Sequence, residues 1–279
     1  MVSRLIGAVL RAILMVMLIA TPSLLLPGIH SDTAQIVALV AIFGAGLTLF
    51  EYGSVYPGLV EFREAPPFNR IRFLSLFFTV FVLSLVARNE VNPTTATQFV
   101  EAIGTLIGSA IDFPYSPVRL IVLMLPDTAS AQDVIVLRTA AGMSYLISLT
   151  SLAFFVVMLR VTGWPRRKGG FNVWVNLPMF DPTSGGDVVE RLERDSRFNV
   201  ALGFLLPFVT PALVKSASGL FGSISMVNDQ TMIWTIAAWA FLPASLFMRG
   251  IAMQRVATLI CEQRERNSIN ADEHAFQPA

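Results

Sequence analysis

Long apolar runs separated by short polar segments dominate the sequence. The apolar core of a bilayer is about 30 Å thick, and a helix rising about 1.5 Å per residue needs roughly 20 residues to cross it. The pattern therefore predicts an all-α integral membrane protein with about six transmembrane helices. The six runs are Leu5–Leu26, Thr33–Tyr56, Phe73–Ala87, Thr139–Leu159, Val200–Phe221 and Gln230–Met248.

The third run is the shortest and depends on its flanking residues. Arg70 and Arg72 precede it, and Arg88 follows it. Because long arginine side chains can reach the interface from a turn inside the apolar region, we still predict that this run spans the bilayer.

Composition supports a membrane location and excludes several kinds of chemistry. Charged residues make up 14% of the chain, whereas soluble proteins carry about 25%. With two His and one Cys, the sequence lacks ligands for a haem held between helices or for a cysteine-based metal site. We therefore expect no cofactor and no metal. A net charge of +1 gives no reason to expect nucleic acid as a partner.

The positions of the basic residues predict the orientation in the membrane. Cytoplasmic loops retain Lys and Arg, and placing the N-terminus inside puts sixteen of the 20 basic residues at or near the cytoplasm. The chain is thus expected to be a multi-pass protein of a bacterial-type cytoplasmic (inner) membrane, with both termini cytoplasmic. Cleavage of the first run as a signal peptide is the less favoured alternative, because no A-x-A site follows it. The basic residues left outside are Arg88, Arg119, Arg138 and Lys215.

The segment between the third and fourth runs is predicted to lie at the outer interface. Phe99, Ile103 and Ile107 recur at helical spacing with polar residues between them, which is typical of an amphipathic helix in the interface plane. A second apolar piece, Val118–Leu125, is too short to span and predicts a re-entrant or interfacial element.

The loop before the fifth run combines a basic cluster with a charged helix. Arg166–Lys168 follow Trp164, a pattern that fixes topology and suits anionic headgroups. Ser184 and Asp187 resemble a capping box, and opposite charges four residues apart predict a short helix that is either a solvated connector or a docking surface. The polar tail is expected to fray beyond Asn267.

The polar segments divide the chain into six parts. These are a three-span N-terminal part at 1–87, an extracytoplasmic interfacial segment at 88–133, the fourth span at 134–160, a cytoplasmic loop at 161–199, a two-span C-terminal part at 200–254 and a cytoplasmic tail at 255–279.

Two ionisable residues inside spans are candidate functional charges. Burying a charge in a bilayer is costly, so Glu51 near the inner end of the second span and Lys215 in the outer third of the fifth suggest a substrate or proton path. The favoured interpretation is that both snorkel to the nearest interface, and the substrate or proton path is the alternative. The fifth span also contains Pro207 and Pro211, which predict a kinked helix of the kind that lines sites in transporters.

Aromatic residues in the loops are candidates for docking to other proteins. Phe62 and Phe68 lie in the loop between the second and third spans, and Trp164 and Trp174 lie in the loop before the fifth. A solvated linker has no need of such side chains, so we predict that they pack against a neighbouring protein or the headgroup layer.

Three functions fit these observations. The leading hypothesis is a non-catalytic accessory subunit or assembly factor of a larger membrane complex, with the lipid bilayer and other membrane proteins as partners. The alternative is a small transporter or channel that uses the proline-kinked fifth span. A membrane enzyme acting on lipid headgroups is the third hypothesis, with Glu101, Asp112 and Arg119 as its candidate residues.

Overall fold

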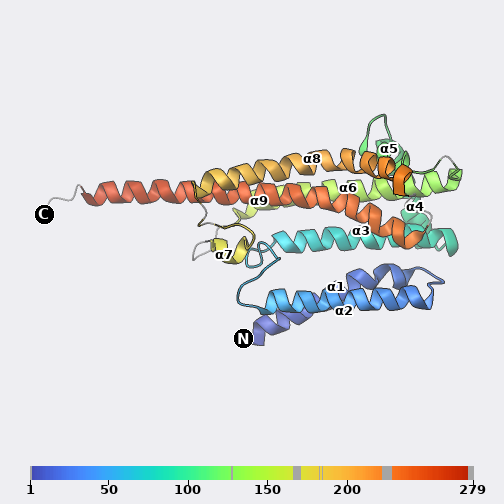
Figure 1. The fold of residues 1–279 in the computed structure, drawn as a ribbon, viewed down its shortest axis with the longest axis horizontal. Coiled ribbons are helices and arrows are strands. Elements are labelled where there is room, and N and C mark those ends of the chain that lie inside the picture. Colours follow the sequence, from blue (N-terminus) through green and yellow to red (C-terminus); the bar gives the residue numbers. More distant parts are fainter. Residues whose placement is uncertain are drawn as a thin grey trace.

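A computed structural model describes residues 2–126, 128–165, 171–181, 183, 185–221 and 228–275, in which every regular element is a helix (Figure 1). Within these ranges, six helices are long and apolar enough to cross a membrane, which confirms the predicted class. They are α1 (Val2–Leu25), α2 (Ser31–Gly53), α3 (Phe68–Val91), α6 (Ala131–Thr162), α8 (Val188–Phe221) and α9 (Asp229–Ala275). The shorter helices are α4 (Thr95–Ile111), α5 (Pro117–Val122) and α7 (Val173–Asn176).

The long helices lie side by side in an elongated bundle (Figure 1). Both chain termini lie at one end, which we call the base, together with α7 and the loop at residues 54–67. The opposite end, which we call the far end, holds α4 and α5. Helix α8 packs along α9, α6 packs on α9 and α3, and α2 packs mainly on α1. The α1–α2 hairpin is therefore joined to the bundle chiefly through the contact of α1 with α3.

Helices α8 and α9 continue well beyond the apolar runs that predict them. Helix α8 begins at Val188, so the predicted charged helix and the fifth span form one continuous element. Helix α9 continues beyond the predicted end of the sixth span to Ala275, past the point where fraying is expected. No Pro interrupts either segment, and charged residues that favour helices allow the helix to continue. The predicted capping residue Ser184 and the basic cluster Arg166–Lys168 lie outside the described residues.

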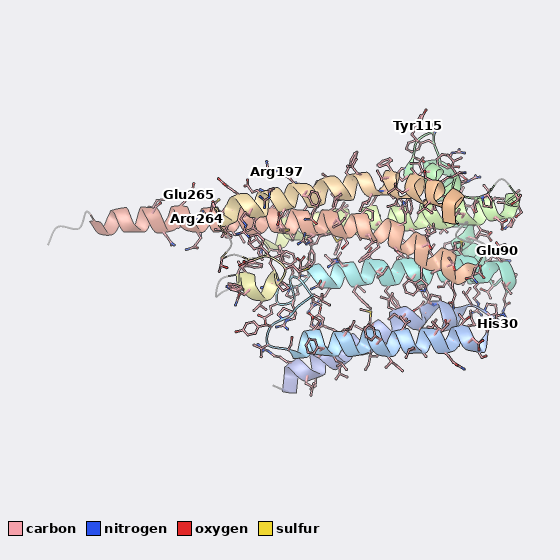
Figure 2. The ribbon with its side chains drawn as sticks, viewed as in Figure 1. His30, Glu90, Tyr115, Arg197, Arg264 and Glu265 are labelled. Atoms are coloured by element: carbon pink, nitrogen blue, oxygen red, sulfur yellow. The ribbon has the colours of Figure 1, made fainter. Side chains whose placement is uncertain are left out.

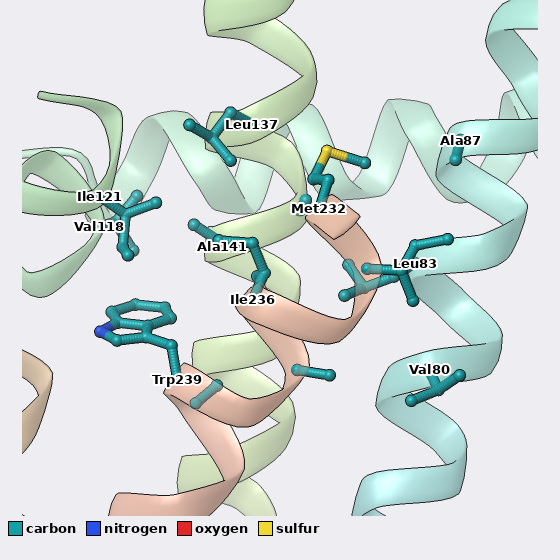
Figure 3. Packing of buried hydrophobic residues seen from close by; sticks show 14 of the residues in the cluster. Val80, Leu83, Ala87, Val118, Ile121, Leu137, Ala141, Met232, Ile236 and Trp239 are labelled. Atoms are coloured by element: carbon teal, nitrogen blue, oxygen red, sulfur yellow. The ribbon is translucent and has the colours of Figure 1, made fainter. Parts of the chain in front are cut away.

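Two apolar cores fill the described interior of the bundle. The core nearer the far end joins α1, α3, α5, α6 and α9, with Leu83, Leu137 and Ile236 fully or almost fully buried at its centre (Figure 3). The core nearer the base contains Phe62 of the 54–67 loop and Phe68 of α3, packed against α6, α8 and α9.

Helix α4 packs on α6 through glycine rather than through its large apolar residues. A Cβ atom added to Gly142 would lie 2.6 Å from the Cα atom of Gly108, so the two backbones touch. Phe99 and Leu106 are exposed on the other side of α4. The apolar pattern thus identifies the helix, while small residues form its packing face.

Candidate functional site

Glu51 organises the loop that follows α2. Its side chain is 5% exposed, and its carboxylate accepts hydrogen bonds from the backbone N–H groups of Gly58, Leu59 and Val60 at 2.9 to 3.2 Å. A buried carboxylate requires such partners, because burying a charge without compensation is costly. The loop therefore wraps around Glu51 and satisfies its charge within the chain.

Arg63 completes this arrangement from the opposite side. Its guanidinium donates hydrogen bonds to the carbonyl oxygens of Glu51, Ser54 and Val55 at 2.8 to 2.9 Å. These carbonyl groups lie where α2 ends and have no later turn of helix to pair with. The Glu51 carboxylate thus pairs with the N–H groups of residues 58–60, and Arg63 pairs with carbonyl groups of residues 51–55.

A second ion pair ties the loop to α9. Glu61 is 7% exposed and forms two parallel hydrogen bonds with Arg249, from Nε at 2.6 Å and from Nη2 at 2.9 Å. Asn69 Nδ2 donates to the Glu61 carbonyl oxygen at 2.7 Å. Bidentate arginine–carboxylate pairs fix both distance and orientation, so this contact sets the position of the loop relative to α9.

Arg72 lies beside this pair in an aromatic environment. Its guanidinium carbon is 5.1 Å from the centre of the Phe68 ring and 5.9 Å from that of Phe241. The Nε atom is buried and has no hydrogen-bond partner among the described residues. Attraction between the cation and the ring faces offsets part of the cost of burying the charge.

Lys215 contacts the far end of the bundle. Its Nζ atom donates a hydrogen bond to the carbonyl oxygen of Leu123, the residue that caps α5. Glu51 and Lys215 therefore lie in separate clusters with different partners, at opposite ends of the bundle. Pro207 and Pro211 both lie inside the continuous helix α8, and Trp239 of α9 contacts the Pro207 carbonyl.

The aromatic docking candidates are mostly inside the chain. Phe62 and Phe68 are fully buried with ring centres 4.5 Å apart, and the Trp164 ring lies 5.5 Å from Phe62. These three side chains belong to the core nearer the base and are not accessible to a partner. Only Trp174, in α7, is exposed among the four candidates. The sequence correctly indicates that Phe62, Phe68 and Trp164 pack against other residues, but those residues belong to the same chain.

The candidate residues for headgroup chemistry are only partly brought together. The Asp112 carboxylate is buried between Arg119, whose Nε lies 2.7 Å away, and Arg138, whose Nε lies 3.2 Å away. Glu101 lies elsewhere and accepts a hydrogen bond from Asn89. Among the described residues, no group of three His, Cys, Asp or Glu side chains is placed to hold a metal ion.

The base also carries an extension of α9, which we define as residues 249–275. Its first half packs on the start of α8, where Ser196 Oγ donates to the Gly250 carbonyl at 2.8 Å and Arg264 forms two hydrogen bonds with Asp187. Beyond Arg264 the extension projects past the other helices (Figure 2). Residues 263–269 are all exposed. The polar composition of this segment did not predict that it continues the helix of the sixth span.

Comparisons with protein-family models, with curated proteins and with solved structures found no match to this chain.

Proposed function

We propose that the chain is a non-catalytic accessory subunit or assembly factor that uses the α9 extension to hold another protein at the membrane. The observation that carries this proposal is the length of α9. Its 47 residues correspond to about 70 Å of helix, whereas a bilayer core needs only about 30 Å. The additional length of α9 projects beyond the bundle. A helix of this kind can serve as a spacer or as a docking element.

The exposed part of the α9 extension offers an apolar contact to a partner. Ile269 is an exposed large apolar residue on this part of α9, and acidic and basic residues surround it. A helical or groove-shaped protein surface that covers Ile269 and pairs with these charges fits the segment.

The proposed setting is a bacterial-type inner membrane with the base in the cytoplasm. Sixteen of the 20 basic residues then lie at or near the cytoplasmic side, which favours this orientation. In this orientation α4 lies at the outer interface with Phe99 and Leu106 toward lipid, and α5 forms the short interfacial element. The proposed partner is then a cytoplasmic protein or the cytoplasmic part of a membrane protein.

The partners of the two candidate charges favour this function over a transporter. Glu51 is compensated by three backbone N–H groups, and Lys215 donates to a backbone carbonyl. A transport path needs charges that can exchange partners with a substrate. We therefore expect Lys215→Met to leave the biological phenotype intact when the protein accumulates normally.

Photo-crosslinking in cells tests the proposal. A photoreactive amino acid at Ile269 should give a discrete crosslinked protein band, whereas one at Tyr115, exposed at the far end, should not give the same band. A chain ending at Arg264 should lose that partner while accumulating at a normal level. The absence of any crosslinked band at Ile269 would contradict the proposal. Full biological activity of the truncated chain would also contradict it.

A further inference from the structure

A polar pocket of about 230 Å³ opens at the base between α1, the end of α2 and the 54–67 loop. We propose that this pocket binds a phosphoryl group, either on an anionic lipid headgroup or on a small phosphate compound. Its lining residues are Arg4, Gly7, Arg11, Tyr52, Arg63 and Glu64.

The spacing on α1 places two arginines on one face. Arg4, Gly7 and Arg11 stand three and four residues apart, so they lie along the same side of the helix. Gly7 leaves room between the two side chains, since a Cβ atom there would lie 2.9 Å from Arg11 Nη1. The absence of a side chain at Gly7 thus gives the pocket its depth along α1.

Arg11 is held in place before any ligand arrives. Its Nη1 donates to the Gly7 carbonyl oxygen at 2.6 Å, and its guanidinium carbon lies 4.5 Å from the centre of the Tyr52 ring. Stacking on a ring leaves the edge of a guanidinium available for hydrogen bonds. A preorganised arginine loses little entropy on binding, which favours recognition of a phosphoryl group.

The pocket has a surplus of positive charge. Its lining contains three arginines and one glutamate, which gives a net charge of +2 from 3 − 1. Arg63 is committed to the carbonyl groups at the end of α2, and Glu64 lies 3.7 Å from it and 4.0 Å from Arg4. Arg4 is largely exposed at the pocket rim. Arg4 and Arg11 are therefore the ligands that we assign to the anion.

The surroundings of the pocket suit a lipid. Leu5 and Ile6 on α1 and Phe50 on α2 are exposed apolar residues next to the lining residues in sequence. Acyl chains can follow these side chains while the headgroup enters the pocket. The first turn of α1, with its positive helix-dipole end, adds to the attraction for an anion at this depth.

Native mass spectrometry of the full chain in mild detergent tests the site. Wild-type protein should retain phosphatidylglycerol over phosphatidylcholine by about tenfold, the effect of roughly one charge-assisted hydrogen bond. Arg4→Gln combined with Arg11→Gln should abolish this preference. Arg70→Gln, which removes an exposed arginine outside the pocket at the base, should keep it. Full preference in the double variant, or equal retention of both lipids by wild type together with equal binding of inorganic phosphate by wild type and the double variant, would overturn the proposal.

Two further measurements keep the result interpretable. Arg4→Gln alone changes an exposed side chain and should lower the preference without lowering the melting temperature, so a folding defect at Arg11 cannot hide the outcome. Inorganic phosphate distinguishes the two ligand sources. Displacement of the lipid by millimolar phosphate assigns the pocket to a small phosphate compound, whereas retention of the lipid assigns it to a headgroup.

Discussion

The indole N–H of Trp239 in α9 donates a hydrogen bond to the carbonyl oxygen of Pro207 in α8, at 3.1 Å. In an uninterrupted helix this carbonyl would accept from the residue four positions later, but that residue is Pro211, which has no N–H group. The neighbouring helix therefore supplies the donor that the proline removes. This contact explains how α8 tolerates Pro211 inside the bundle.

Trp239→Phe should lower the free energy of unfolding by about 1 kcal/mol, because it leaves the Pro207 carbonyl without a donor. The measurement is unfolding in mixed detergent micelles. In a Pro211→Ala background the residue at 211 has an N–H group for the same carbonyl. The loss caused by Trp239→Phe should then be clearly smaller. Equal losses in the two backgrounds would refute this account of the hydrogen bond.

Glu51→Gln should loosen the 54–67 loop without disturbing the bundle. The variant loses the charge that three backbone N–H groups share, at a cost of about 1–3 kcal/mol. We expect faster proteolysis between residues 54 and 60. Asp32→Asn, an exposed change at the other end of α2, is the control and should leave the cleavage rate unchanged. A protected loop in Glu51→Gln would show that the carboxylate does not organise it.

Arg249→Met should destabilise the protein more than the double variant Glu61→Leu with Arg249→Met. Removing one partner leaves a buried charge without compensation, at a cost of about 3–5 kcal/mol, whereas replacing both removes the charge as well. A double-mutant cycle on the unfolding free energy gives the coupling between the two residues. Additive effects of the single changes would mean that the pair contributes no coupling energy.

Gly142→Ala should separate α4 from α6, because the new Cβ would lie 2.6 Å from the Cα atom of Gly108. Overpacking of this kind costs about 1–3 kcal/mol and should lower the melting temperature. Gly46→Ala is the matched control, since a Cβ atom there would have nothing within 4 Å. A melting temperature in Gly142→Ala equal to that of the control would contradict the close crossing.

Asp187 should titrate at unusually low pH. Two hydrogen bonds from Arg264 hold the pKa of this carboxyl below its ordinary value of 3.8. The contact therefore stabilises the base at pH values above the ordinary pKa of this carboxyl, and its contribution is lost as the pH falls through the lower folded pKa. Arg264→Gln should raise the pKa toward its ordinary value in an NMR titration. Arg266→Gln should not, because Arg266 pairs with Glu262.

The number of spanning helices could be predicted because a bilayer leaves the backbone few options. A lipid-exposed segment must satisfy its own N–H and C=O groups, so an apolar run of sufficient length becomes a helix. Even the short third run follows this rule, and α3 extends on both sides of it into the flanking arginines. The continuity of α8 with its charged N-terminal segment and the length of α9 could not be predicted in this way, because hydropathy falls while the helix continues.

The contacts of the candidate site were harder to predict. Glu61 and Arg249 are 188 residues apart, and nothing in local sequence pairs them. Aromatic residues such as Phe62 and Phe68 are common both at docking surfaces and in buried cores. Only the fold shows which of the two environments they occupy here. Glu51 was identifiable as a charge inside a predicted span. Its partners are backbone N–H groups, which the sequence of side chains does not reveal.

The continuity of α9 also makes it a lever. The helix that presents Ile269 near its tip also places Met253 and Val256 in the core nearer the base, and no proline lies between them, so the tip and that core share one helical segment. Over an arm of about 40 Å beyond Arg249, a tilt of about 5° at the bundle displaces the tip by roughly 3 Å. A force applied at the exposed tip is thus transmitted along this segment to the core nearer the base.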